Sequence, residues 1–278
     1  MAKLAQRVAD RIATGLRKFQ PILDSAKARD INESDTVVIV TDILQYVLGF
    51  DKYSEITSEF QIRSTYCDLA IKLDGRLALL IEVKAIGLTL KDNHVKQATD
   101  YAANQSCEWV LLTNGAHWQA YKINFAKPVT NELVLDIDLC QLNPKKGADL
   151  QQAWLLSKEG LQKSGLSEYQ AMREALSRFS LAALLLSESV IDVLRRELRR
   201  ITPDARIEED AIRAVLTNEV LKREVLEGDR ADAARRLVAR AANRKLRKSA
   251  EQEEVDSTPE SDTELSMGAV VTGGAVSS

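Results

Sequence analysis

The chain is poor in the residues that build zinc sites, disulfide frameworks and aromatic surfaces. Its 278 residues include two histidines, three cysteines and only 5% aromatic residues. Cys67, Cys107 and Cys140 show no CxxC spacing, and an odd number of cysteines cannot all pair. We therefore expect neither a disulfide-stapled secreted domain nor a zinc site built from His and Cys. The composition favours the reducing cytoplasm, with any metal held by oxygen atoms.

Long apolar runs and nucleotide-binding loops are also missing. The longest apolar runs, residues 77–81 and 181–186, are far shorter than the ~20 residues that a helix needs to cross a bilayer. The chain opens with an amphipathic pattern instead of the apolar core of a signal peptide. No glycine-rich Walker loop ending in Lys-Ser or Lys-Thr occurs. The sequence therefore predicts neither a membrane protein nor an ATP-driven motor.

Charge is distributed unevenly along the chain. The formal net charge is -3, from 38 basic and 41 acidic residues, but residues 250–278 hold seven of the acids and no base. This tail is rich in Ser, Thr and Gly and lacks aromatic residues, so it cannot bury enough apolar area to offset the entropy of ordering. We expect the tail to be disordered.

A basic run precedes the acidic tail. Residues 230–248 carry eight bases against one acid, and Arg236, Arg240, Arg244 and Lys248 recur every four residues, which places them on one helix face. The run is typical either of a solvated helix or of a helix that contacts the phosphates of a nucleic acid. In the second case the acidic tail could compete with nucleic acid for this face.

Hydrophobic periodicity predicts helices, then a mixed α/β region, then helices alone. A first helix over 4–19 should end at Pro21, and a second should begin at Ser34 or Asp35 and stop at Gly49. Strands are predicted at 55–62, 66–73, 77–84, 109–113 and 118–123, with an edge strand at 133–137 and a helix at 92–104. Later helices are predicted at 150–162, 168–198, 208–227 and 230–248.

These patterns divide the chain into four parts. They are an N-terminal helical segment (1–32), an α/β domain (33–143), an all-helical C-terminal region (144–249) and the acidic tail (250–278). The third boundary follows from Pro144 and Gly147, which are typical of a linker.

One strand of the α/β domain carries charges that an apolar strand does not tolerate without partners. Glu82 and Lys84 interrupt the strand at 77–84, and a period of two places both on one face. A hairpin that pairs Leu73 with Leu77 would set Asp68 opposite Glu82, with Cβ atoms ~5 Å apart.

Two carboxylates at that spacing can share a hard divalent cation. Mg²⁺ commonly binds one or two carboxylates together with waters and substrate phosphate. Lys84 is placed to stabilise charge that develops on phosphorus. Asp68, Glu82 and Lys84 thus predict metal-assisted hydrolysis of a phosphodiester, and the alternative is a buried ion network without chemistry.

The helix at 92–104 adds polar groups near these charges. Gln97 and Tyr101 are one turn apart, with His94 on the same side. An amide and a phenol in these positions could orient water or hold a phosphate, whereas His94 is more simply a polar helix residue.

Asp68, Glu82-x-Lys84 and Gln97-x-x-x-Tyr101 together resemble the PD-(D/E)xK nuclease signature. The chain is similar in particular to the N-terminal nuclease domain of the R subunit of type I restriction enzymes, over about 33–139. The similar segments are 48–51, 66–70, 81–85 and 112–115.

This resemblance implies a restriction-endonuclease-like mixed sheet flanked by helices, and cleavage of DNA with Mg²⁺ or Mn²⁺. It implies that Asp68 and Glu82 bind the metal and that Lys84 is catalytic. From their position on the helix, we also predict that Gln97 joins them in catalysis and that Tyr101 binds substrate. Such families often add a helix-borne Glu before the first strand, for which Glu33 is the best candidate and Glu59 the second.

We therefore predict a Mg²⁺-dependent deoxyribonuclease of a restriction or defence type. Arg236, Arg240 and Arg244 would bind DNA, and a homodimer would supply two sites for cutting both strands. One alternative is an inactive nucleic-acid-binding or regulatory module on the same fold. Another is a scaffold whose C-terminal helices carry the function.

Overall fold

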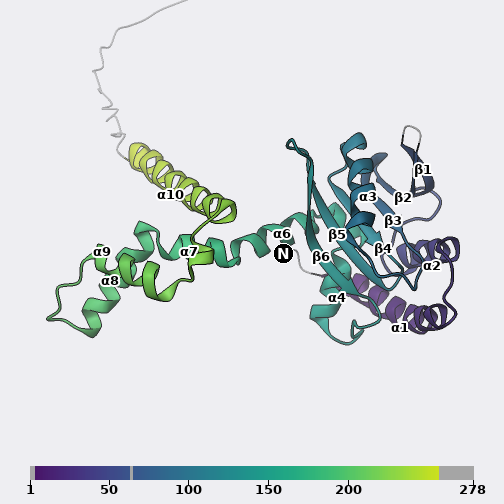
Figure 1. Ribbon diagram of the computed structural model, residues 1–278, viewed down its shortest axis with the longest axis horizontal. Coiled ribbons are helices and arrows are strands. Elements are labelled where there is room, and N and C mark those ends of the chain that lie inside the picture. The colour runs from purple at the N-terminus through teal and green to yellow at the C-terminus, as the bar shows by residue number, and fades with distance from the viewer. Residues whose placement is uncertain (1–3, 63–64, 257–278) are drawn as a thin grey trace, which may run out of the picture. The chain divides into compact units, whose positions relative to one another are not determined.

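The computed structural model describes residues 4–62 and 65–256, in two compact units that divide between Glu174 and Ala175. The first unit contains a six-stranded mixed sheet with helices on both faces, and the second unit is helical (Figure 1). This arrangement confirms the predicted fold class. In the part of the chain that the structure describes, none of the helices combines the length and apolarity that membrane crossing requires.

The sheet follows chain order from β1 to β6, and only β3 and β4 are parallel. Helix α3 makes the crossover that a parallel pair requires. All predicted strands are present, and the last one lies at a sheet edge as expected. The elements of the first unit are α1 (Gln6–Ala28), α2 (Glu33–Tyr46), β1 (Ile56–Ile62), β2 (Thr65–Leu73), β3 (Arg76–Val83), α3 (Asp92–Gln105), β4 (Trp109–Thr113), β5 (His117–Asn124), β6 (Thr130–Asp138), α4 (Gly147–Trp154), α5 (Lys158–Gln162) and α6 (Gly165–Ala175).

Two predicted helix ends are wrong. Helix α1 continues through Pro21 to Ala28, because the lost backbone bond is outweighed by the burial of Leu23, which lies beyond the proline and is 1% exposed. Helix α2 is capped by Asn32, whose side chain accepts a hydrogen bond from the Asp35 amide at 2.9 Å. The helix therefore begins at Glu33, before the predicted caps.

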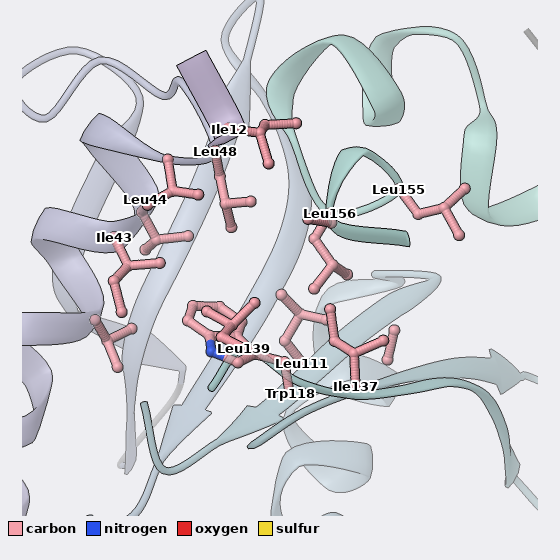
Figure 2. Close-up of a cluster of buried hydrophobic side chains, with 14 of the residues drawn as sticks. Ile12, Ile43, Leu44, Leu48, Leu111, Trp118, Ile137, Leu139, Leu155 and Leu156 are labelled. Carbon is pink, nitrogen blue, oxygen red and sulfur yellow. The ribbon is translucent and has the colours of Figure 1, made fainter. Parts of the chain in front are cut away.

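The sheet separates two hydrophobic cores. Helices α1, α2 and α4 pack on one face, where Ile12, Leu44 and Trp118 are fully buried. Helix α3 covers the other face, where Ala98 of α3 and Leu80 of β3 belong to one buried cluster. Figure 2 shows the larger core, in which side chains from both N-terminal helices and from the sheet converge.

Residues 144–174 are integrated into the first unit. Leu155 and Leu156 are buried in the larger core (Figure 2). The Arg11 guanidinium donates to both carboxylate oxygens of Glu159, at 2.7 and 2.6 Å, and also to the carbonyl of Leu48. These contacts explain why the compact unit extends to Glu174, whereas the sequence analysis divided the chain after residue 143.

The predicted long helices of the C-terminal region are divided into shorter ones. Ser157 and Ser177 interrupt the predicted helices, and each caps a new helix by accepting an amide hydrogen bond at 3.1 Å. The second unit contains α7 (Arg178–Leu185), α8 (Glu188–Ile201), α9 (Glu209–Val215), a π-helical turn (Leu216–Val220), a 3-10 turn (Arg223–Val225) and α10 (Asp229–Asp256).

Helix α10 confirms the predicted basic helix and extends it. Its last residues, 250–256, belong to the segment that the sequence analysis assigned to the tail, so α10 ends later than the predicted helix. They continue the helix because Glu and Gln are good helix formers. The rest of the predicted tail, 257–278, lies outside the described residues.

Gly49 allows a test of the contact that joins α1 to the later segment. Its φ is +85°, and a Cβ there would lie 2.4 Å from the Arg11 guanidinium carbon. Gly75 is the matched control, because its φ is +74° but its Cβ would meet nothing within 4 Å. We expect Gly75→Ala to lower the free energy of unfolding by about 1 kcal/mol, from strain alone. Gly49→Ala should lower it by about 2–3 kcal/mol, because it also displaces Arg11 from Glu159.

Urea unfolding followed by tryptophan fluorescence measures this difference, because all three tryptophans are buried in the first unit. Equal losses in the two variants would show that the Arg11 contact contributes nothing.

Candidate active site

The β2–β3 hairpin sets the register of the candidate site. Asp74 and Gly75 have φ values of 52° and 74°, typical of a two-residue type I′ turn. This turn pairs Leu73 with Arg76 and not with Leu77, so the predicted three-residue loop is wrong. The Asp-Gly pair, the strongest short hairpin signal, explains the difference.

A β-bulge then restores the register that the sequence predicted. The pairing shifts between Ile71 and Lys72, and beyond it Leu69 lies opposite Ile81. Continued by one residue, this register brings Asp68 to Glu82. The Asp68 carboxylate accepts a hydrogen bond from the Val83 amide at 2.7 Å, which fixes it against β3.

Glu82 is a buried carboxylate with one oxygen left without a partner. Its side chain is 2% exposed, and Oε1 accepts a hydrogen bond from Lys84 Nζ at 2.7 Å. Oε2 is buried and meets no donor within the described residues. Burial raises the pKa of Glu82 to about 7; the Lys84 bond opposes this shift, and the charges of Asp68 and Glu33 add to it.

Burial and neighbouring charges also shift the pKa of the other groups. Burial is the main cause that raises the pKa of Asp68 above its ordinary value. For Lys84, burial acts downward, but the bond to Glu82 and the nearby carboxylates outweigh it and raise the pKa. Lys84 is therefore an ammonium group held between acids.

Glu33 lies beside this cluster. It is the first residue of α2, and its Oε2 is 3.7 Å from Lys84 Nζ. The second candidate, Glu59, is exposed on β1 and forms no ion pair in the described parts of the chain. The structure thus brings Glu33 to Lys84 through α2, whereas Glu59 lies on β1 between Ser58 and Phe60, which pair with Leu69 and Cys67 of β2.

The chemistry of the donor set fits a hard cation. An unpartnered buried carboxylate oxygen on Glu82, with the Asp68 carboxylate beside it, is the kind of ligand that Mg²⁺ prefers. Within residues 4–62 and 65–256, no three His, Cys, Asp or Glu side chains are grouped so that they could hold a metal ion. Glu33 contacts Lys84 and does not complete a three-carboxylate set. A metal half-site formed by Asp68 and Glu82 stays a prediction.

Gln97 and Tyr101 are paired with each other on α3. Gln97 Nε2 donates to the Tyr101 hydroxyl at 2.8 Å, and Tyr101 is 9% exposed in the core that α3 covers. His94 accepts a hydrogen bond from the Lys91 amide and so caps α3. The one-turn spacing produces the expected pair, but the bond joins Gln97 to Tyr101 and not to the carboxylates.

Cys67 lies next to Asp68 but has no nucleophilic character. Its Sγ is fully buried and donates to the Ile81 carbonyl at 3.2 Å. Burial, with the charges of Glu82 and Asp68, raises the pKa of Cys67 to about 12. The thiol therefore stays protonated at neutral pH.

The predicted DNA-binding arginines belong to the second unit. Arg236, Arg240 and Arg244 are exposed on α10 and have no acidic partner within the described part of the chain. Arg235, by contrast, is bonded to Asp232. The three unpaired arginines recur at the expected four-residue spacing.

Comparison with known proteins supports the reading of the first unit. Residues 39–136 match the family model described as the type I restriction enzyme R protein N terminus. The matched segment contains the two carboxylates, Lys84 and the α3 pair, but not Glu33. The match confirms the resemblance predicted from the sequence. No match was found among curated proteins or among solved structures.

The raised pKa of Glu82 predicts how stability depends on pH. The folded state binds this proton more tightly than the unfolded chain, where the pKa is near 4.5. The contribution of the Glu82 proton to the stability of the folded state is therefore complete below about pH 4.5, and it is lost as the pH rises through about 7. Relative to Glu82→Gln, the wild-type chain should lose up to about 3 kcal/mol of unfolding free energy across this interval.

Urea unfolding at a series of pH values measures this difference. Glu132→Gln, at an exposed glutamate of β6 that accepts a hydrogen bond from the Gln170 side chain, is the control and should follow the wild type. Parallel profiles for wild type and Glu82→Gln would contradict the prediction.

Proposed function

We propose that this protein is a Mg²⁺-dependent endonuclease that hydrolyses phosphodiester bonds of DNA in a restriction or defence role. The observation that carries the proposal is the buried, partnerless Oε2 of Glu82 beside Asp68 and Lys84. A purely structural ion network would satisfy this oxygen, because leaving a buried charged atom unpaired costs several kcal/mol by rough estimate. A divalent cation is a partner that would offset this cost.

Asp68 and Glu82 are the residues that would hold the cation, with Mn²⁺ as an alternative to Mg²⁺. When bound, such a cation polarises the phosphoryl group and activates water. The Val83 amide orients the Asp68 carboxylate, and the β3 backbone fixes Glu82. Lys84 supplies an ammonium group beside Glu82 that can donate to a phosphoryl oxygen as negative charge develops there.

The chain also offers groups for binding and positioning DNA. We propose that Arg236, Arg240 and Arg244 bind backbone phosphates, because each is exposed and lacks an acidic partner among the described side chains. Tyr101 and Gln97 would contact substrate only after their mutual bond opens. A homodimer would provide the two sites that cutting both strands requires.

The first test is cleavage of plasmid DNA with Mg²⁺ or Mn²⁺. We expect Asp68→Ala, Glu82→Ala and Lys84→Ala each to reduce the cleavage rate by ~100-fold or more, because each removes a group that acts on the reacting phosphate. Lys72→Ala is the control, since Lys72 lies on the neighbouring strand and stacks over Phe60. Cleavage that persists in all three site variants would remove the proposed active site.

The second test measures DNA binding against salt concentration in Ca²⁺. Changing Arg236, Arg240 and Arg244 together to Gln should lower the slope of log affinity against log salt by roughly 2–3, because each phosphate contact contributes ~0.9. A matched triple variant changes Arg178, Arg206 and Arg223, which are paired with glutamates. A slope that falls equally in both variants would contradict a specific role for α10.

A second candidate function is a nucleic-acid-binding module that does not cut. The pairing of Lys84 with two glutamates, and the lack of a third metal-ligating side chain within the described residues, favour this alternative. Retained, salt-sensitive DNA binding without cleavage in either metal would establish it in place of the endonuclease.

A further inference from the structure

Asn114 is a buried polar residue of the first unit, and every donor and acceptor position of its side chain forms a hydrogen bond. It is 4% exposed. Its Oδ1 accepts hydrogen bonds from the amides of Ala116, at 3.2 Å, and His117, at 2.8 Å. Its Nδ2 donates to the carbonyls of Ile86, at 3.3 Å, and Leu88, at 2.9 Å. An asparagine amide can make four such bonds, and all four are made.

The two ends of this side chain serve different segments. The oxygen builds the turn between β4 and β5, as Asn commonly does in turns. The nitrogen reaches a loop 26 to 28 residues earlier in the sequence, between β3 and α3. A turn needs only the oxygen, so the donor end has a second purpose.

The loop that Asn114 holds begins at Lys84. The Lys84 amide donates to the Thr113 carbonyl at 2.8 Å, and the Leu88 amide donates to the Ala85 carbonyl at 2.9 Å. Ile86, between them, is 1% exposed. The end of β4 therefore fixes the backbone of Lys84 on one side, and Asn114 fixes the chain immediately after it.

The same loop approaches the segment that leads to Glu33. Gly87 is exposed, yet a Cβ at this position would lie 2.2 Å from Asp30 Oδ1. Asp30 precedes Glu33 by three residues, in the connection between α1 and α2. Gly87 therefore lies close to the Asp30 carboxylate, at the end of the connection that leads to Glu33.

We propose that Asn114 is a positioning residue for the proposed active site. Through its two bonds to the loop at 85–88, it keeps Lys84 against Glu82 and at its observed 3.7 Å from Glu33. The role in the reaction rests on the proposed function, whereas the hold on the loop does not.

Asn114→Asp separates the two ends of the side chain. The aspartate keeps an oxygen that can accept the hydrogen bonds of the turn. Its second oxygen cannot donate to the carbonyls of Ile86 and Leu88 and repels them, which releases the loop. We expect the single-turnover cleavage rate to fall by ~10- to 100-fold, because small displacements of a reacting group cost this much. The KM for DNA should stay within about twofold, because the loop provides none of the arginine contacts.

Two further variants keep the test independent of folding. Gly87→Ala pushes the loop from Asp30 at an exposed position without a positive φ, and we expect it to slow cleavage with an unchanged melting temperature. Asn124→Asp is the control, because Asn124 accepts a hydrogen bond from a backbone amide at the opposite end of β5, and an aspartate there can still accept it. It should cleave at the wild-type rate.

Hydrogen exchange of residues 84–88 provides a readout that needs no cleavage. We expect faster exchange there in Asn114→Asp and wild-type exchange in Asn124→Asp. Unchanged exchange in Asn114→Asp, or faster exchange with an unchanged cleavage rate, would overturn the positioning role. If the wild-type chain itself does not cleave DNA, the proposed function fails, while exchange still decides whether Asn114 holds the loop.

Discussion

The first unit is organised around the burial of one carboxylate at the end of an apolar strand. Glu82 is as inaccessible as its leucine neighbours on β3, yet only one of its oxygens is bonded, to Lys84. Such a group is expensive to bury, so the surrounding elements must provide compensating charges at fixed positions. The hairpin partner Asp68, the start of α2 and the end of β4 all meet at this point.

The topology explains why they meet there. β3 and β4 run parallel to each other, and each has an antiparallel neighbour on its other side, β2 and β5 respectively. The chain leaves the carboxyl end of β3, crosses by α3 and then runs along β4. Asn114, which follows β4, holds the loop that follows β3, so the parallel pair also fixes the backbone next to Lys84.

Much of this arrangement could be predicted from the sequence, because periodicity reports which face of a strand is buried. It placed all six strands and the shared face of Glu82 and Lys84. The two-residue turn is indicated by the Asp74-Gly75 pair, but the compensating bulge could not be predicted, because the pattern gives the same register at Asp68 with a three-residue loop and no bulge. The continuation of α1 past Pro21 and the inclusion of residues 144–174 depend on burial against distant segments, which local patterns do not contain. The contact of Asn114 with Ile86 and Leu88 is equally non-local.

Cys67 shows a chemical side effect of this design. Thiols react with oxidants and alkylating agents as thiolates, and the negative field around Asp68 and Glu82 suppresses the thiolate at a position where burial already disfavours it. Asp68 and Glu82, whose burial is costly, thus also keep the neighbouring Cys67 thiol unreactive. Under oxidative stress, oxidants should therefore react with exposed or half-exposed groups of this protein before they react with the Cys67 thiol.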